Sequence, residues 1–148
     1  MRHAEARFFI VDDEPSIRMS LSHVLAEMGY RVRTAEDGFS ALAELREEIP
    51  DILLSDLNMP GMSGFELLLE VRRLFPSIQT IAMSGAFSGD EVPSGVAADA
   101  FYQKGCGVAS LLKIVESLPR SRRVQSNDPA TLARISIQPR RQSASEEA

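Results

Sequence analysis

Five polar residues of this chain lie at or just beyond the ends of four short segments rich in apolar residues. They are Asp12 and Asp13, Asp56, Ser84 and Lys104. Carboxylates held close together repel one another, and their pKa values rise unless a cation neutralises them. Mg²⁺ is such a cation, and it takes oxygen ligands, usually alongside a phosphate. A hydroxyl and an ammonium can hold the remaining oxygens of a phosphoryl group. The set therefore predicts an acyl-phosphate site with a nucleophilic carboxylate, Mg²⁺, a serine and a lysine.

Each of these residues also has a simpler interpretation when it is taken alone. Asp12 and Asp13 could cap a helix. Asp56 and Ser84 could be ordinary turn residues. Lys104 could be a solvated surface lysine. The site is favoured because all five occur together, each after a predicted strand and in the expected order.

The apolar segments before these residues have the length of strands. The predicted strands are 8–11, 31–35, 52–55, 78–83 and 100–103. They alternate with helical patterns, which indicates βαβ units and a parallel sheet covered on both faces. Five repeats give an α/β domain of the (βα)5 doubly wound type. Its strands end at one shared edge, where ligands gather in open α/β sheets, so the polar residues are expected to converge there.

Helices are predicted between the strands from apolar periodicity and capping residues. Asp13 or Glu14 is expected to cap the first helix, Asp37 the second, and a Ser63–Glu66 capping box the third. Gly29, Pro50 and Pro76 are expected to end them. The predicted inward residues are Ile17, Leu21, Val24, Leu25 and Met28; Phe39, Leu42, Leu45 and Ile49; Phe65, Leu68, Leu69 and Leu74; and Val108, Leu111, Leu112, Val115 and Leu118. Segment 85–98 contains Gly89, Pro93 and Gly95, so its helix is expected to be short or irregular.

Composition places the chain among ordinary globular proteins. It has 148 residues, 44% of them apolar and 25% charged, which suits one domain. The single cysteine, Cys106, excludes an internal disulfide framework and fits a reducing cytosol; we expect it to be buried. His23 is expected to be exposed, and His3 to lie in a frayed terminus. No apolar run approaches the roughly 20 residues of a membrane span, and a cytoplasmic location is predicted.

Charge is distributed unevenly along the chain. The net charge of −5 divides into −8 for residues 1–118 and +3 for residues 119–148. We therefore predict a domain over 6–118 followed by a basic, disordered tail over 119–148. A solvated linker is favoured over a nucleic-acid contact for this tail, and a helix-turn-helix output domain would need far more chain.

Over about residues 6–118, the chain resembles a known family. The motifs are Asp12-Asp13, the run from Ser55 to Gly64, Met83-Ser84-Gly85, and the run from Ala98 to Lys104. They are similar to the receiver domain of bacterial response regulators, a CheY-like, flavodoxin-like fold with strand order 2-1-3-4-5. The resemblance implies a single-domain receiver, a signalling switch of a two-component phosphorelay that has no output domain of its own and is not an enzyme.

The same resemblance implies how the acids act. Asp56 would accept a phosphoryl group from a histidine kinase or a histidine phosphotransfer protein. Mg²⁺ would be bound by Asp13, by Asp56 and by the backbone carbonyl of Asn58, and by Asp12 through a water molecule. The phosphorylated form would then bind a downstream protein, whose identity the sequence does not indicate.

The resemblance also implies a switch on the other side of the phosphoryl group. Ser84 would be the switch hydroxyl, Phe101 the rotating aromatic, and Lys104 the lysine that contacts phosphoryl oxygens. Two features depart from the family pattern. Gly105 stands where a proline usually follows the lysine, and segment 85–98 stands where the family has a full helix. That helix, the fifth strand and the last helix form the expected output and homodimer face.

Two other functions are compatible with an aspartyl nucleophile. One is a Mg²⁺-dependent phosphatase or phosphotransferase, but such enzymes typically have a second acid two residues after the nucleophile, where this chain has Asn58. The other is a degenerate receiver that serves only as a binding scaffold, for which Gly105 and the broken segment 85–98 are the support. The intact acid cluster favours the phosphoacceptor.

Overall fold

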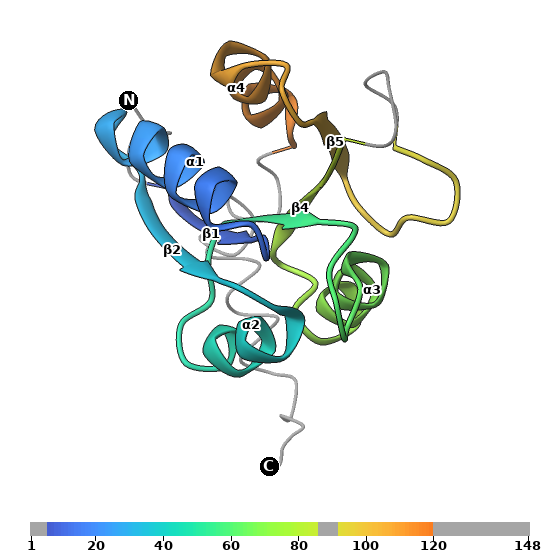
Figure 1. Ribbon diagram of the computed structural model, residues 1–148. Helices are drawn as coiled ribbons and strands as arrows, with labels where there is room; N and C mark the ends of the chain where they lie inside the picture. The colour runs from blue at the N-terminus through green and yellow to red at the C-terminus, as the bar shows by residue number, and fades with distance from the viewer. Residues whose placement is uncertain (1–5, 86–91, 120–148) are drawn as a thin grey trace, which may run out of the picture. The chain divides into compact units, whose positions relative to one another are not determined.

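A five-stranded parallel sheet forms the centre of the computed structural model, which describes residues 6–85 and 92–119 (Figure 1). The strands are β1 (Arg7–Val11), β2 (Arg31–Ala35), β3 (Ile52–Asp56), β4 (Gln79–Ser84) and β5 (Ala100–Gln103). They lie in the order β2-β1-β3-β4-β5, and all neighbours are parallel. Every residue of β3 and β4 is buried, as expected of a sheet covered on both faces. The predicted α/β fold and strand order are confirmed.

Helices cover both faces of this sheet. Along the described chain they are α1 (Pro15–Glu27), α2 (Gly38–Leu45), α3 (Gly64–Leu74) and α4 (Val108–Ser117). Figure 1 shows α1 and α4 on one face and α2 and α3 on the other. Side chains alternate along a strand, so Phe8 packs in the core beneath α1 and α4 while Phe9 packs in the core beneath α2 and α3. The sheet therefore separates two hydrophobic cores.

Most of the predicted caps are present. The Asp37 side chain accepts a hydrogen bond from Ser40 N at 2.7 Å, and both bonds of the Ser63–Glu66 capping box are formed. Gly29 follows the end of α1 with a φ of 101°. The first helix is different, because Glu14 occupies the N-cap position without a side-chain capping bond. The carboxylate of Asp12 accepts the backbone N–H of Glu14 instead, at 2.9 Å.

The predicted inward faces of the first three helices were partly wrong, and Met28, which follows α1, is exposed. Phe39 and Leu69 are 64% and 59% exposed, and Ile49 and Leu74 are also exposed. The buried positions are Gly38, Ala41 and Leu45 in α2 and Gly64, Leu67, Leu68 and Val71 in α3. Glycine at the start of each helix lets its first turn lie close to neighbouring chain, which rotates larger apolar residues outward. The second helix also ends at Leu45 rather than reaching Ile49.

Residues 92–99 form no helix in the structure, and Gly95 makes a turn with a φ of 84°. Asp99 anchors this segment to β4, since its carboxylate accepts the N–H of Thr80 at 2.8 Å and lies 3.4 Å from Arg72. A short or irregular helix was predicted over 85–98; residues 92–98 contain no helix, and 86–91 lie outside the described residues, so the helix itself stays a prediction. The predictions for His3 and for the tail beyond Pro119 lie outside them too. Within the described ranges, no helix has the length and apolarity that crossing a membrane requires.

Candidate functional site

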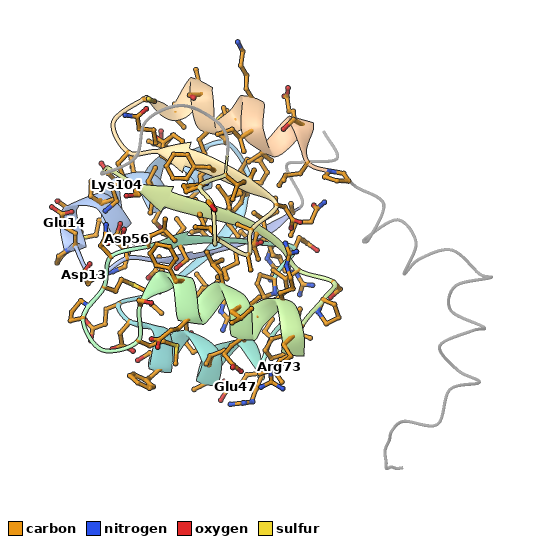
Figure 2. All side chains as sticks on the ribbon, turned by 90° about the vertical axis from the view of Figure 1, so that its right-hand side faces the viewer. Asp13, Glu14, Glu47, Asp56, Arg73 and Lys104 are labelled. Atoms are coloured by element: carbon orange, nitrogen blue, oxygen red, sulfur yellow. The ribbon has the colours of Figure 1, made fainter. Side chains whose placement is uncertain are left out.

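The carboxyl ends of the strands bring the predicted site residues to one edge of the sheet. Asp12 follows β1, Asp56 ends β3, Ser84 ends β4 and Lys104 follows β5. In Figure 2 the labelled side chains of Asp56, Lys104 and Asp13 lie together at this edge. This is the convergence that a parallel sheet imposes.

Lys104 lies between two of the acids. Its Nζ is 3.1 Å from Asp12 Oδ2 and 3.2 Å from Asp56 Oδ2. Glu14 Oε1 is further away, at 3.8 Å. Burial lowers the pKa of Lys104, but the hydrogen bonds and charges of Asp12 and Asp56 outweigh it, so the pKa is raised overall. The lysine is therefore held as an ammonium between the two carboxylates.

Asp56 is a buried carboxylate, with only 4% of its surface exposed. Burial raises its pKa, and the neighbouring charge of Asp12 raises it further. The N–H of Asn58, 3.2 Å from Asp56 Oδ1, and the Lys104 ammonium act in the opposite direction. The pKa stays raised overall. Separately, the three clustered carboxylates of Asp12, Asp13 and Asp56 outnumber the Lys104 ammonium beside them.

The acidic side chains have the dimensions of a small cation site. One carboxylate oxygen from each of Asp12, Asp13 and Asp56 lies within 4.8 Å of the other two. Octahedral Mg²⁺ with bonds of about 2.1 Å places opposite ligands about 4.2 Å apart. Asp12 is fully buried and Asp13 is exposed, so the cluster opens to solvent on one side. All-oxygen ligands, excess negative charge and this size fit Mg²⁺.

Close backbone packing fixes the position of Asp56. The N–H of Leu57 donates to Met83 O at 2.9 Å, and the N–H of Gly64 donates to Leu57 O at 3.0 Å. These bonds tie both ends of the loop between β3 and α3 to the sheet. A β-carbon on Gly64 would overlap the carbonyl oxygen of Asp56. Glycine is therefore required there for α3 to begin directly against the end of β3.

Ser84 and Phe101 are both buried. Ser84 has no exposed surface, and its carbonyl accepts the N–H of Lys104 at 3.0 Å. Phe101 is 1% exposed and belongs to the core beneath α2 and α3. The serine is thus directly linked to the site through the backbone of Lys104, while Phe101 faces the core. Their predicted roles as switch residues stay predictions.

The turn after Lys104 shows how Gly105 replaces proline. Gly105 has a φ of 91°, which a proline ring cannot adopt, and Lys104 nevertheless reaches both acids. The prediction that Cys106 is buried was wrong, because this cysteine is exposed. It lies in the turn between Gly105 and Gly107, before α4 begins, and among the described residues no helix or strand covers it.

Two residues near the site were missed by sequence reasoning. Arg18 donates to the carbonyl oxygen of Asp12 at 2.6 Å. Glu14, read only as a helix cap, lies near the Lys104 ammonium. Arg18 begins the second turn of α1, so its spacing from Asp12 was the signal that could have found it. No comparable signal separates Glu14 from an ordinary capping acid.

Comparison with known families and structures agrees with this geometry. The model of the response regulator receiver domain matches residues 8–116, and the chain belongs to this family. It is a signalling phosphoacceptor rather than a conventional enzyme, which sets aside the phosphatase alternative.

Particular relatives make the likeness more specific. The DNA-binding transcriptional regulator NtrC of Salmonella typhimurium is 39% identical over 97 residues, which are 66% of this chain and 19% of that protein. Chemotaxis response regulator CheY4 of Vibrio cholerae has a TM-score of 0.70 at 33% identity, over 76% of this chain and 97% of that one.

Response regulator TrrA of Thermotoga maritima, solved with Mg²⁺ and BeF, has a TM-score of 0.70 at 34% identity, over 77% of this chain and 99% of that one. TrrA has also been solved in complex with histidine kinase ThkA. The chain thus spans about a fifth of the length of NtrC and nearly all of CheY4 and TrrA.

Proposed function

We propose that this chain is a phosphorylation-dependent switch of a two-component phosphorelay, in which Asp56 accepts a phosphoryl group from a phosphohistidine. A carboxylate oxygen of Asp56 attacks the phosphorus, the phosphorus–nitrogen bond breaks, and the electron pair returns to the donor imidazole. The observation that carries this proposal is the Lys104 ammonium held 3.2 Å from the buried Asp56 carboxylate. A cation at that place stabilises the negative charge of the transferring group.

We assign Mg²⁺ to the acidic cluster as the cofactor. Asp13, Asp56 and the carbonyl of Asn58 would bind it directly, and Asp12 would do so through water. When bound, the ion neutralises charge on the attacking carboxylate and on the phosphoryl oxygens. The support is the fit of the cluster and the Mg²⁺ present in the TrrA structure.

The conformational switch is proposed to involve Lys104, which lies beside the acidic residues, together with Ser84 and Phe101. A phosphoryl group on Asp56 adds negative charge and new acceptor oxygens. Lys104 would exchange its contact with Asp56 for one of these oxygens, and the hydroxyl of Ser84 would donate to another. Because Lys104 N is bonded to Ser84 O at 3.0 Å, the two residues would move together. Phe101, in the adjoining core, is proposed to change its packing in response.

The phosphoryl donor is proposed to approach over α1. An apolar groove of about 280 Å³ lies between α1 and the segment that follows β5. Its lining includes Ile17, Leu21, Tyr102, Lys104 and Val108. Lys104 belongs both to the groove and to the acid site, so a helix seated in the groove would bring its phosphohistidine next to Asp56. The TrrA complex shows that a related regulator binds a histidine kinase.

We further propose that residues 6–118 form the receiver domain, that 119–148 is a basic tail, and that the protein acts in the cytoplasm. The downstream target is proposed to be a protein. The acidic charge of residues 1–118, at −8, disfavours direct nucleic-acid binding by this domain.

The test is to treat the protein with acetyl phosphate and Mg²⁺ and to measure its intact mass. The wild type is expected to gain one phosphoryl group, and Asp56→Asn to gain none. Asp37→Asn is the matched control, because asparagine caps a helix as well as aspartate does, and it should label like the wild type. Absence of labelling in wild-type protein that demonstrably binds Mg²⁺ would overturn the proposal.

A further inference from the structure

An apolar groove runs between α2 and α3, on the face of the sheet away from α1. Its volume is about 500 Å³, and it is lined by Phe39, Leu42, Gly61, Met62, Glu66, Leu69 and Glu70. Two of these residues project strongly into solvent, since Phe39 is 64% and Leu69 is 59% exposed. Exposed large apolar side chains that gather around a groove mark a surface that binds a partner.

The side chains along this stripe of α3 carry opposite charges at its two ends. Glu66 stands in the first turn, Leu69 and Glu70 in the middle, and Arg73 in the last turn. Arg73 is 66% exposed, and its NH2 lies 2.8 Å from Glu70. A second α3 helix laid antiparallel across the first, centred between positions 69 and 70, would place Arg73 opposite Glu66. The stripe is therefore complementary to itself when it is reversed.

We propose that this α2–α3 face binds a second copy of the chain about a two-fold axis that passes near Leu69. The face carries both a projecting aromatic side chain and an apolar groove, and both an acidic and a basic end. A two-fold interface requires this kind of self-complementarity. The Arg73 end of one copy would meet Glu66 and the exposed Phe39 ring of the other, and both attract a guanidinium.

The rest of the described surface gives less support to another dimer face. Sequence analysis placed a homodimer on the segment after β4, β5 and the last helix. Within residues 92–119, none of the large exposed apolar side chains is found. Those of the described chain are on or just beyond α1, on or just beyond α2, and on α3. Of these, Phe39 and Leu69 line one groove.

The groove shares a loop with the acid site. Gly61 and Met62 line it, and they belong to the loop that follows Asp56 and carries Asn58. A β-carbon on Gly38 would press on the Met62 side chain, so α2 and this loop are in close contact. Dimerisation is therefore expected to respond to phosphorylation. This coupling rests on the proposed function, whereas the dimer itself does not.

The test is sedimentation equilibrium of the full chain from micromolar to millimolar concentration, without any phosphodonor. Wild-type protein is expected to form a concentration-dependent dimer. Phe39→Ser and Leu69→Ser are each expected to weaken association by about tenfold or more, the loss typical of a central interface residue. Met19→Ser is the matched control, because Met19 is similarly exposed, at 67%, but lies on α1. This variant should dimerise like the wild type. Circular dichroism verifies that each variant is folded.

A charge exchange gives a second, independent measurement. Arg73→Glu places two acids opposite each other and should weaken the dimer, while Glu66→Lys combined with Arg73→Glu should restore it. Loss of the Glu66 cap cannot produce such a restoration. Wild type that stays monomeric at all concentrations would overturn the proposal, and the face would then serve another partner or none. A Phe39→Ser variant that dimerises like the wild type would also overturn it. Neither result bears on the labelling of Asp56.

Discussion

Gly64 lies so close to the backbone of Asp56 that no side chain fits between them. A β-carbon at position 64 would overlap the Asp56 carbonyl oxygen and lie 2.6 Å from Leu57 Cα. Both obstacles are backbone atoms, which cannot move aside as a flexible side chain can. The same close contact therefore fixes both the position of Asp56 in the acid site and the residue at which α3 begins.

Gly64→Ala is consequently expected to destabilise the protein by about 1–3 kcal/mol, the usual cost of overpacking. It should also slow labelling of Asp56 by acetyl phosphate. Urea denaturation measures the first effect, and the rate of mass gain the second. Gly85→Ala is the control, since its β-carbon would meet Lys104 Cβ at an ordinary 3.9 Å. Equal stability of the two variants would contradict the packing argument.

Asp56→Asn should stabilise the Mg²⁺-free protein at neutral pH. Because the folded pKa of Asp56 is raised above 3.8, folding disfavours its ionised form, and wild-type stability is lost as pH rises through that folded pKa. Asparagine removes this penalty, and Asp12 still pairs with Lys104. The difference in unfolding free energy between variant and wild type should be small below about pH 4 and positive at pH 7. Denaturation at both pH values, with EDTA present, is the measurement; a difference independent of pH would refute the assignment.

Lys104→Met should destabilise the Mg²⁺-free protein by about 2–3 kcal/mol at pH 7. This is below the 3–5 kcal/mol typical of breaking a fully buried pair, because the lysine side chain is 18% exposed. The loss should shrink in acid, where Asp56 is protonated. Mg²⁺ should restore more stability to this variant than it adds to the wild type. Thermal melts with and without the ion test this, using Lys113→Met as the control.

Asp13→Ala separates metal binding from folding. Asp13 is exposed, so its loss should change the stability of the metal-free protein by no more than about 0.5 kcal/mol. Its carboxylate belongs to the acid cluster, so the rise in melting temperature that Mg²⁺ gives the wild type should largely disappear. Titration of Mg²⁺ during thermal melts distinguishes the two effects. An unchanged response to Mg²⁺ would remove Asp13 from the ligand set.

Much of the site could be predicted because parallel strands end sharply and at one edge. Asp56 and Lys104 lie far apart in sequence, yet each follows an apolar segment of strand length, and topology alone brings them together. The strand segments needed no more than hydrophobic pattern and turn residues, whereas the register that pairs Asp56 with Met83 comes from the structure.

Helix orientation was less predictable, because hydrophobicity does not specify how closely a helix approaches its neighbours. Phe39 and Leu69 were assigned to the interior from apolar periodicity, but Gly38 and Gly64 occupy the positions of closest approach. Cys106 was misplaced for a related reason: its burial depends on where α4 begins, and two glycines with positive φ delay that start. Arg18 was missed because its hydrogen bond is made to the backbone carbonyl of Asp12, so only its spacing from Asp12, and no pairing of side-chain types, indicates the contact.

The separation of the two hydrophobic cores by a single sheet has a further consequence for signalling. Asp56 lies at the edge of the sheet that separates the two cores. Lys104 beside it lines the groove next to α1, and the loop after it carries Met62, which lines the groove between α2 and α3. A change at Asp56 could therefore affect the surfaces on both faces of the sheet. The proposed phosphodonor over α1 and the proposed second copy over α3 lie on opposite faces of the sheet, so phosphorylation of Asp56 would not require the dimer to dissociate.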